Sequence, residues 1–164
     1  AFKAAVVARL TADGALGAAT PPVHIAYGLP HTGLERDAVL VGNTRGDDPT
    51  DASQYPGGQT GRIGHGTTPE REERYVLECV VTVTRAFREP QQTVTERGFT
   101  IAAAIENSLR AWQVEATPYS GIVRWAQVTA LYHVEGTGTQ TDGNGIPVER
   151  GSRVFIDIAC SARI

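Results

Sequence analysis

The sequence predicts a single α+β domain with a mixed, mainly antiparallel sheet, two flanking helices and long loops. Strand-like alternation of apolar and polar residues recurs along the chain, most regularly from Val154 to Ile164. One long segment, Val94 to Trp112, instead has the three-and-four spacing of an amphipathic helix. At 164 residues the chain is long enough to bury one core, so residues 1–164 are expected to form one domain.

Composition argues against several classes of protein. The net charge of -3 gives no basic face of the kind that nucleic-acid binding requires. The longest apolar runs fall short of the roughly 20 residues of a membrane span, and Phe2 to Leu10 is too short for a signal peptide. We therefore expect no membrane partner, and a place in the cytosol or in a particle assembled there.

The N-terminal part of the chain predicts one short helix and two short strands. An apolar stripe indicates a helix over Phe2 to Leu10, which Gly14 is expected to end as a left-handed cap. This helix should pack on a sheet edge or against a neighbouring subunit. Alternation then predicts strands at Val23 to Tyr27 and Asp37 to Gly42.

The middle of the chain, residues 73–134, predicts strand, helix and strand. Glu73 to Glu89 has one strongly apolar face and one mixed face, and at ~3.3 Å per residue it is longer than a small core requires, so one end should project beyond the sheet or bend at a bulge. Thr93 and Glu96 match a capping box that would open the helix. Gly121 to Val134 is apolar on both faces, which indicates a central strand or one whose outer face meets another subunit. The apolar stripe of the helix comprises Phe99, Ala102, Ile105, Leu109 and Trp112.

The two cysteines, Cys79 and Cys160, lie in phase with the apolar faces of their strands. This position favours two buried thiols. The alternative is a disulfide or a shared metal, and no CxxC motif or Cys/His cluster supports it.

Two long polar segments interrupt the regular pattern, at about 43–72 and 135–152. The first is rich in glycine and proline, and a stretch of this length inside a compact domain is either a floppy loop or a segment that orders against a partner. We favour the second interpretation. The second segment contains Asp142-Gly143-Asn144-Gly145, which is typical of a reversal in a long hairpin. The candidate partner-binding residues of the first segment are Arg45, Asp47, Asp48, Tyr55, Arg62, His65 and Arg71.

No motif in the sequence indicates catalysis. Gly61 to Thr68 has the glycine spacing of a phosphate-binding loop, but Thr67 stands where that loop requires lysine. The four histidines have no metal-ligand spacing. We therefore expect no catalytic residue, cofactor or metal, and no enzymatic activity. If the domain does bind a small ligand, the most plausible polar pocket would lie near His24, His133 and Glu135.

Three stretches carry a resemblance to a known family: Arg74-Tyr75-Val76-Leu77-Glu78-Cys79, Ala102-Ala103-Ala104-Ile105-Glu106 and the strand Ile122 to Val134. Together with the order of elements, they resemble tail terminator proteins of long-tailed, siphovirus-type bacteriophages with actinobacterial hosts. The resemblance covers most of the chain from Phe2 to Ile164. It implies a small α+β domain that forms a hexameric ring at the head-proximal end of the tail tube, stops tube polymerisation and presents the head–tail joining surface.

The resemblance also implies partners and a location. The partners would be further copies of the chain, the tail tube protein and the head–tail connector or neck protein. Genomic DNA would pass through the lumen without specific binding, which suits a net negative charge. The location would be the virion, after assembly in the host cytoplasm. The alternatives are another connector, neck or tail tube protein and, from a different class, a small ligand-binding or enzymatic α+β domain.

Overall fold

A computed structural model describes residues 2–28, 36–42, 53–54, 60–62, 70–137, 142–146 and 148–163. Its sheet follows the order β1-β2-β5-β7-β6, and two short strands pair with β5 off this path. β1 runs parallel to β2, whereas all other strand pairs are antiparallel. The predicted mixed, mainly antiparallel sheet is therefore confirmed. The strands are β1 (His24–Tyr27), β2 (Asp37–Val41), β3 (Ser53–Gln54), β4 (Thr60–Arg62), β5 (Glu70–Ala86), β6 (Trp125–Thr137) and β7 (Glu149–Arg163).

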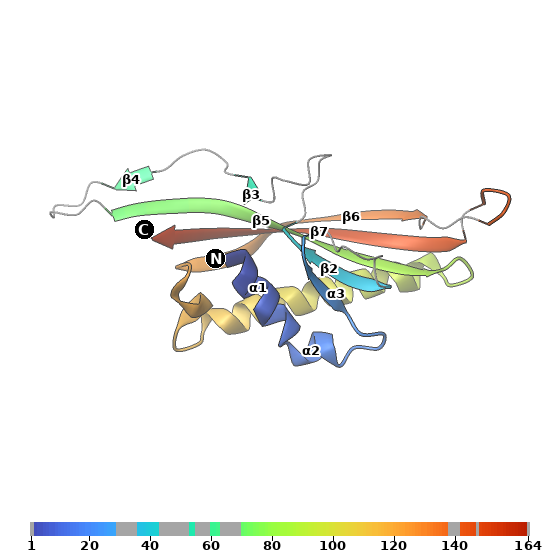
Figure 1. Cartoon of the computed structure of the whole chain (residues 1–164), viewed down its shortest axis with the longest axis horizontal. Helices are drawn as coiled ribbons and strands as arrows, with labels where there is room; N and C mark the ends of the chain where they lie inside the picture. Colours follow the sequence, from blue (N-terminus) through green and yellow to red (C-terminus); the bar gives the residue numbers. More distant parts are fainter. Residues whose placement is uncertain are drawn as a thin grey trace.

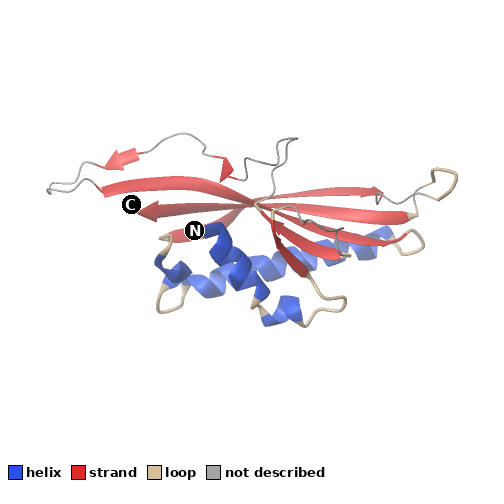
Figure 2. Cartoon of the chain, viewed as in Figure 1, coloured by secondary structure: helices blue, strands red, loops and turns tan. Residues whose placement is uncertain are grey.

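The helices lie together on one side of the sheet (Figure 1, Figure 2). They are α1 (Phe2–Thr11), α2 (Gly14–Gly17) and α3 (Gln91–Gln113), with a short 3-10 turn, η1 (Pro118–Gly121), after α3. The α+β class is confirmed, although α2 adds a short third helix to the two expected. None of the described helices combines the length and apolar character that crossing a bilayer requires.

The start of α1 follows the sequence pattern, and its end does not. Phe2, Val6 and Leu10 are buried, as their spacing predicts, and α1 packs against the face of the outer strand β1, where Ile25 contacts the same core cluster. The expected left-handed cap at Gly14 is wrong, because Gly14 is the first residue of α2. Asp13 caps that helix instead: its Oδ1 accepts hydrogen bonds from the backbone N–H groups of residues 15 and 16 at 2.9 and 3.4 Å.

Helix α3 begins at Gln91, three residues before the expected position. The predicted capping box is wrong, because Pro90 is the N-cap and no side chain caps the helix. Proline at this position has its φ fixed at a favourable value and is extended, with φ of -61° and ψ of 136°. Glu96 lies too far into the helix to reach the N-cap, and its carboxylate instead accepts a hydrogen bond of 2.6 Å from Gln92.

The buried face of α3 is rotated slightly from the predicted stripe. Phe99 was expected on it but is 40% exposed, which corrects that assignment. The neighbouring Gly98 faces β7 instead, so closely that a Cβ at this position would lie 3.0 Å from the hydroxyl of Ser152. Phe99 lies at the flank, where its ring meets His133 with centroids 5.0 Å apart. The buried residues of α3 are Val94, Gly98, Ile101, Ala102, Ile105, Ser108, Leu109 and Trp112.

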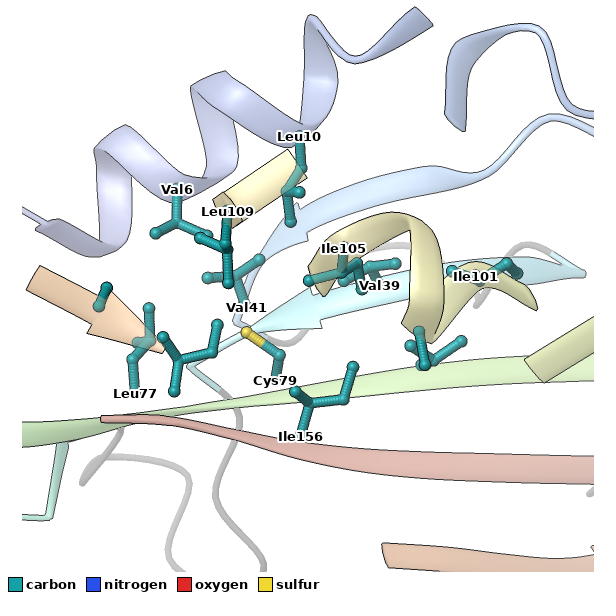
Figure 3. Packing of buried hydrophobic residues seen from close by; sticks show 14 of the residues in the cluster. Val6, Leu10, Val39, Val41, Leu77, Cys79, Ile101, Ile105, Leu109 and Ile156 are labelled. Atoms are coloured by element: carbon teal, nitrogen blue, oxygen red, sulfur yellow. The ribbon is translucent and has the colours of Figure 1, made fainter. Parts of the chain in front are cut away.

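The main core lies between the helices and the sheet. Side chains from α1, α3 and the facing strands meet there around Cys79 (Figure 3). Both cysteines are buried and neither forms a disulfide, as predicted. Burial raises the pKa of Cys79 from 9.0 to about 12, so this thiol stays protonated at neutral pH. The residues labelled in Figure 3 are Val6, Leu10, Val39, Val41, Leu77, Cys79, Ile101, Ile105, Leu109 and Ile156.

A smaller cluster lies on the opposite face of the sheet. Ala26, Ala38, Leu40 and Val80 are buried there, with Phe155 packed against them. The second face of β5 is thus partly covered, as its mixed pattern predicted.

Strand β5 begins and ends three residues earlier than predicted. After Ala86 the chain turns, with the N–H of Glu89 donating to the carbonyl of Ala86 at 2.9 Å, and Pro90 then opens α3. The seventeen residues of β5 span about 55 Å. They pair with β7 from Glu72–Arg163 to Ala86–Glu149. The start of β5 and the end of β7 extend beyond the helices (Figure 1). The predicted projection of the strand beyond the sheet, or a bend at a bulge, is wrong, because the start of β5 pairs with β4 and the strand pairs with β7 in unbroken register from Glu72 to Ala86.

The two polar segments contain more strand than expected. Residues 43–72 include β3, β4 and the start of β5, which corrects the prediction of a structureless stretch for these parts. Both short strands bond to the side of β5 opposite β7. The hairpin prediction is confirmed, with β6 and β7 extending into residues 135–152. In its turn, Asp142 Oδ1 accepts hydrogen bonds from the backbone N–H groups of Asn144 and Ile146 at 2.8 and 2.9 Å.

Candidate interaction surface

Most of the predicted partner-binding residues lie outside the described residues. This holds for Arg45, Asp47, Asp48, Tyr55 and His65. The backbones of the other two lie on adjacent strands, since β4 pairs with the start of β5. Arg62 and Arg71 are therefore brought close, with Arg62 opposite Glu70 and Gly61 opposite Arg71.

The alternative pocket near His24, His133 and Glu135 is not formed. His24 lies on β1 and the other two on β6, at opposite edges of the sheet order. His133 Nε2 lies 3.0 Å from the hydroxyl of Ser152, and Glu135 accepts a hydrogen bond of 2.7 Å from Thr95. These contacts hold β6 to β7 and to α3. In the part of the chain that the structure describes, no three His, Cys, Asp or Glu residues gather as metal ligands would.

A buried charge cluster joins β2, β5 and α3. Asp37 is fully buried, and its two oxygens accept from Arg85 at 2.5 Å and from Arg97 at 2.7 Å. Arg97 also donates to the carbonyl of Pro21 at 2.9 Å, and Arg85 to that of Thr84 at 2.8 Å. Each guanidinium thus has a carboxylate and a carbonyl partner. The cluster therefore has a structural role: it holds β2, β5 and α3 together, with the Asp37 carboxylate enclosed away from solvent.

Among the strand residues whose exposure the structure describes, β6 carries the largest number of exposed large apolar side chains. It was predicted to be central or to meet a subunit with its outer face; the central position is wrong, because β6 is the last strand in the order. Leu131, Tyr132 and Val134 are 45%, 55% and 52% exposed. Leu131 pairs with Ile156, a core residue, whereas Tyr132 and Val134 lie on the opposite face.

The two halves of β6 differ. A register shift between Val128 and Ala130 interrupts the ladder to β7. Before it, the hydroxyl of buried Tyr119 donates to the carbonyl of Ala126 at 2.8 Å, which anchors the strand to η1. After it, Ala130 to Thr137 continues as a regular strand bonded to β7 on one side, and no described strand pairs with its other side. This second half is the candidate interaction surface.

The sequence contained a signal for this surface, but not its position. Apolar residues on both faces fit a central strand and an edge strand that another molecule covers. Only the observed strand order separates these two possibilities. The more informative signal is the near absence of charge: within Trp125–Thr137, Glu135 is the single Asp, Glu, Lys or Arg residue.

A second exposed apolar group lies where two turns meet at one end of the sheet. Phe87, Ile146 and Val148 are 48%, 58% and 39% exposed. The N–H of Phe87 donates to the carbonyl of Val148 at 2.9 Å, and Arg150 lies over the Phe87 ring at 4.5 Å. The guanidinium group of Arg150 therefore covers part of this group.

The chain matches no protein-family model, and no curated protein matches it significantly.

Proposed function

We propose that this chain is a structural virion protein, a tail terminator that forms a ring on the head-proximal end of a phage tail tube. The ring would end tube polymerisation and provide the surface that joins the tail to the head. The observation that carries this proposal is the extension of the sheet beyond its helical layer (Figure 1).

The lengths of the elements quantify this extension. The 17 residues of β5 span about 55 Å, whereas the 23 residues of α3 span about 35 Å. A sheet end without a covering helix lacks a core of its own, and such an end gains stability when another chain packs on it. Ring formation and stacking of the ring on a tube end would both supply such cover.

The proposed partners follow from this role. Copies of the chain would associate head to tail through two different surfaces, as closed rings of heterologous contacts require, with six copies as the proposed number. The tail tube protein would meet one side of the ring and the connector or neck protein the other. The net charge of -3 suits a lumen through which genomic DNA passes without being held. The protein would be assembled in the host cytoplasm and remain in the virion.

Electron microscopy of the purified protein tests this role against its nearest alternatives. A terminator is expected to give single rings, and to cap tubes when it is mixed with tail tubes of the same phage. Filaments of the chain alone would indicate a tube protein instead. Rings that bind connectors and ignore tube ends would indicate a neck protein.

A thermal-shift screen tests the remaining class of function. A specific small-molecule hit on a protein that stays monomeric and leaves tube growth unchanged would overturn the structural role in favour of ligand binding.

A further inference from the structure

We infer that the second half of β6, Ala130 to Thr137, is an assembly edge that pairs with strand β1 of a second copy of this chain. The inference rests on the proposed function only in that copies associate. It specifies which strands form the contact, a point that ring formation by itself leaves open.

The first argument is that this edge lacks the usual protection. Monomeric proteins protect exposed edge strands with lysine, proline, inward charges or bulges, because an unpaired row of N–H and C=O groups is a template for another strand. The bulge and the Tyr119 hydrogen bond restrain only the first half of β6. The second half contains neither lysine, arginine nor proline, and it exposes Leu131, Tyr132 and Val134.

The chain places its charged residues on other strands, so the scarcity of charged residues on β6 is informative. β5 carries acidic and basic residues along its length (EREERYVLECVVTVTRA), although it lies inside the sheet order. β6 lies at the edge and has one. A protein that had to keep this edge free in solution would be expected to show the reverse distribution.

The second argument identifies the occupant as the same chain. The sheet order ends in β1 on its other side, and β1 (HIAY) contains no Asp, Glu, Lys or Arg. The second half of β6 carries one charged residue, Glu135, whose carboxylate accepts a hydrogen bond from Thr95, and β1 carries none, so the two edges can pair in successive copies without a charge conflict between their strands. Tyr27 at the end of β1 is 59% exposed, with Lys3 Nζ 3.8 Å from the centre of its ring, so this edge offers an aromatic side chain with a cation beside it for contact.

Strand direction fits the same pairing. β1 is parallel to β2, and each further step along the order to β6 is antiparallel, so β1 and β6 run in opposite directions. Rotation of a copy about an axis along the strands preserves these directions. β6 of one copy would then meet β1 of the next as an antiparallel pair, and the repeat of this step closes a ring.

Charge placed on the edge tests the inference. Tyr132→Lys and Val134→Lys are expected to weaken self-association by roughly tenfold or more, because each adds a solvated cation where strands must pack. Val114→Lys is the matched control, since Val114 is 83% exposed at the end of α3. Mass photometry over a dilution series measures the effect, and circular dichroism confirms that each variant is folded. If both β6 variants still form oligomers, the proposed contact between β6 and β1 is overturned and ring formation is not. A wild-type chain that is monomeric would overturn both the β6–β1 contact and the proposed ring.

A cysteine-mixing experiment tests the identity of the partner strand and does not depend on the lysine variants being folded. His24→Cys and Val134→Cys chains are purified separately, mixed and treated with a short bismaleimide; the native thiols are buried and so protected. Crosslinked pairs that require both variants are the expected result. Crosslinking of Val134→Cys with itself would show a two-fold β6–β6 contact and overturn the pairing with β1, as would no crosslinking in a mixture that still oligomerises.

Discussion

Replacing Asp37 with alanine removes the carboxylate that holds Arg85 and Arg97 together in the interior. The two guanidinium groups would then face each other with side chains only 11% and 20% exposed. Removing one partner of a buried ionic group costs about 3–5 kcal/mol, because the remaining charge stays desolvated. Some water reaches both arginines, so we expect a loss near the lower end, about 3 kcal/mol.

This loss is large enough for a simple assay. In a domain of 164 residues, about 3 kcal/mol corresponds to a fall in Tm of roughly 6–12 °C. Thermal unfolding followed by circular dichroism measures it, and urea unfolding gives the free energy independently. Asp37→Asn separates charge from shape, since it keeps the volume and one acceptor oxygen, and its loss should fall between that of alanine and wild type.

The matched control is Glu106→Gln, which removes an exposed carboxylate from a 2.6 Å pair with Arg110 on α3. Its effect should stay within about 0.5 kcal/mol, because water screens both groups. An Asp37→Ala protein as stable as this control would refute the view that the buried cluster clamps β2, β5 and α3.

Three further perturbations probe the packing. Gly98→Val should lower the free energy of unfolding by about 1–3 kcal/mol in urea, because the new side chain would press on Ser152. Gly136→Ala is the comparison, since Gly136 has open space around it. Equal losses in the two variants would contradict close packing at Gly98. Tyr119→Phe should cost about 1–3 kcal/mol, since a buried carbonyl loses its donor, and an unchanged Tm would show the bond to be dispensable. The free energy of unfolding should fall as pH rises above 9.0, because the folded protein keeps the proton of Cys79 up to about pH 12 while the unfolded chain loses it. Cys79→Ala should flatten that dependence in urea titrations, and an identical slope would assign it to other groups.

Sequence periodicity predicted the elements well and their arrangement poorly, for a physical reason. The stripes of α1 and α3 and the alternation of β5 and β7 arise from burial on one face, which local spacing records. Strand order depends on which strands pair across the sheet. No local pattern in the sequence could therefore show that β6 lies at the edge.

The smaller corrections involve residues next to the predicted ones that take over their structural role. Pro90 replaced the capping box at Thr93, and Asp13 began a new helix where Gly14 was expected to end one. The buried face of α3 includes Gly98, which packs closely against β7, and Phe99 lies at its flank. The predicted partner-binding residues remain a prediction, because five of the seven lie outside the described residues and the side chains of Arg62 and Arg71 are not described.

The pairing of β5 with β7 has a consequence for how the chain reaches its fold. The paired residues are separated by about 60 to 90 positions in sequence, whereas β6 and β7 form a local hairpin. On the ribosome, β5 therefore emerges long before its partner and waits with one long side open. We expect the β6–β7 hairpin to form first and then dock as a unit, so that the middle of the sheet closes last. Until that moment the longest strand of the protein is also the one most available to other chains.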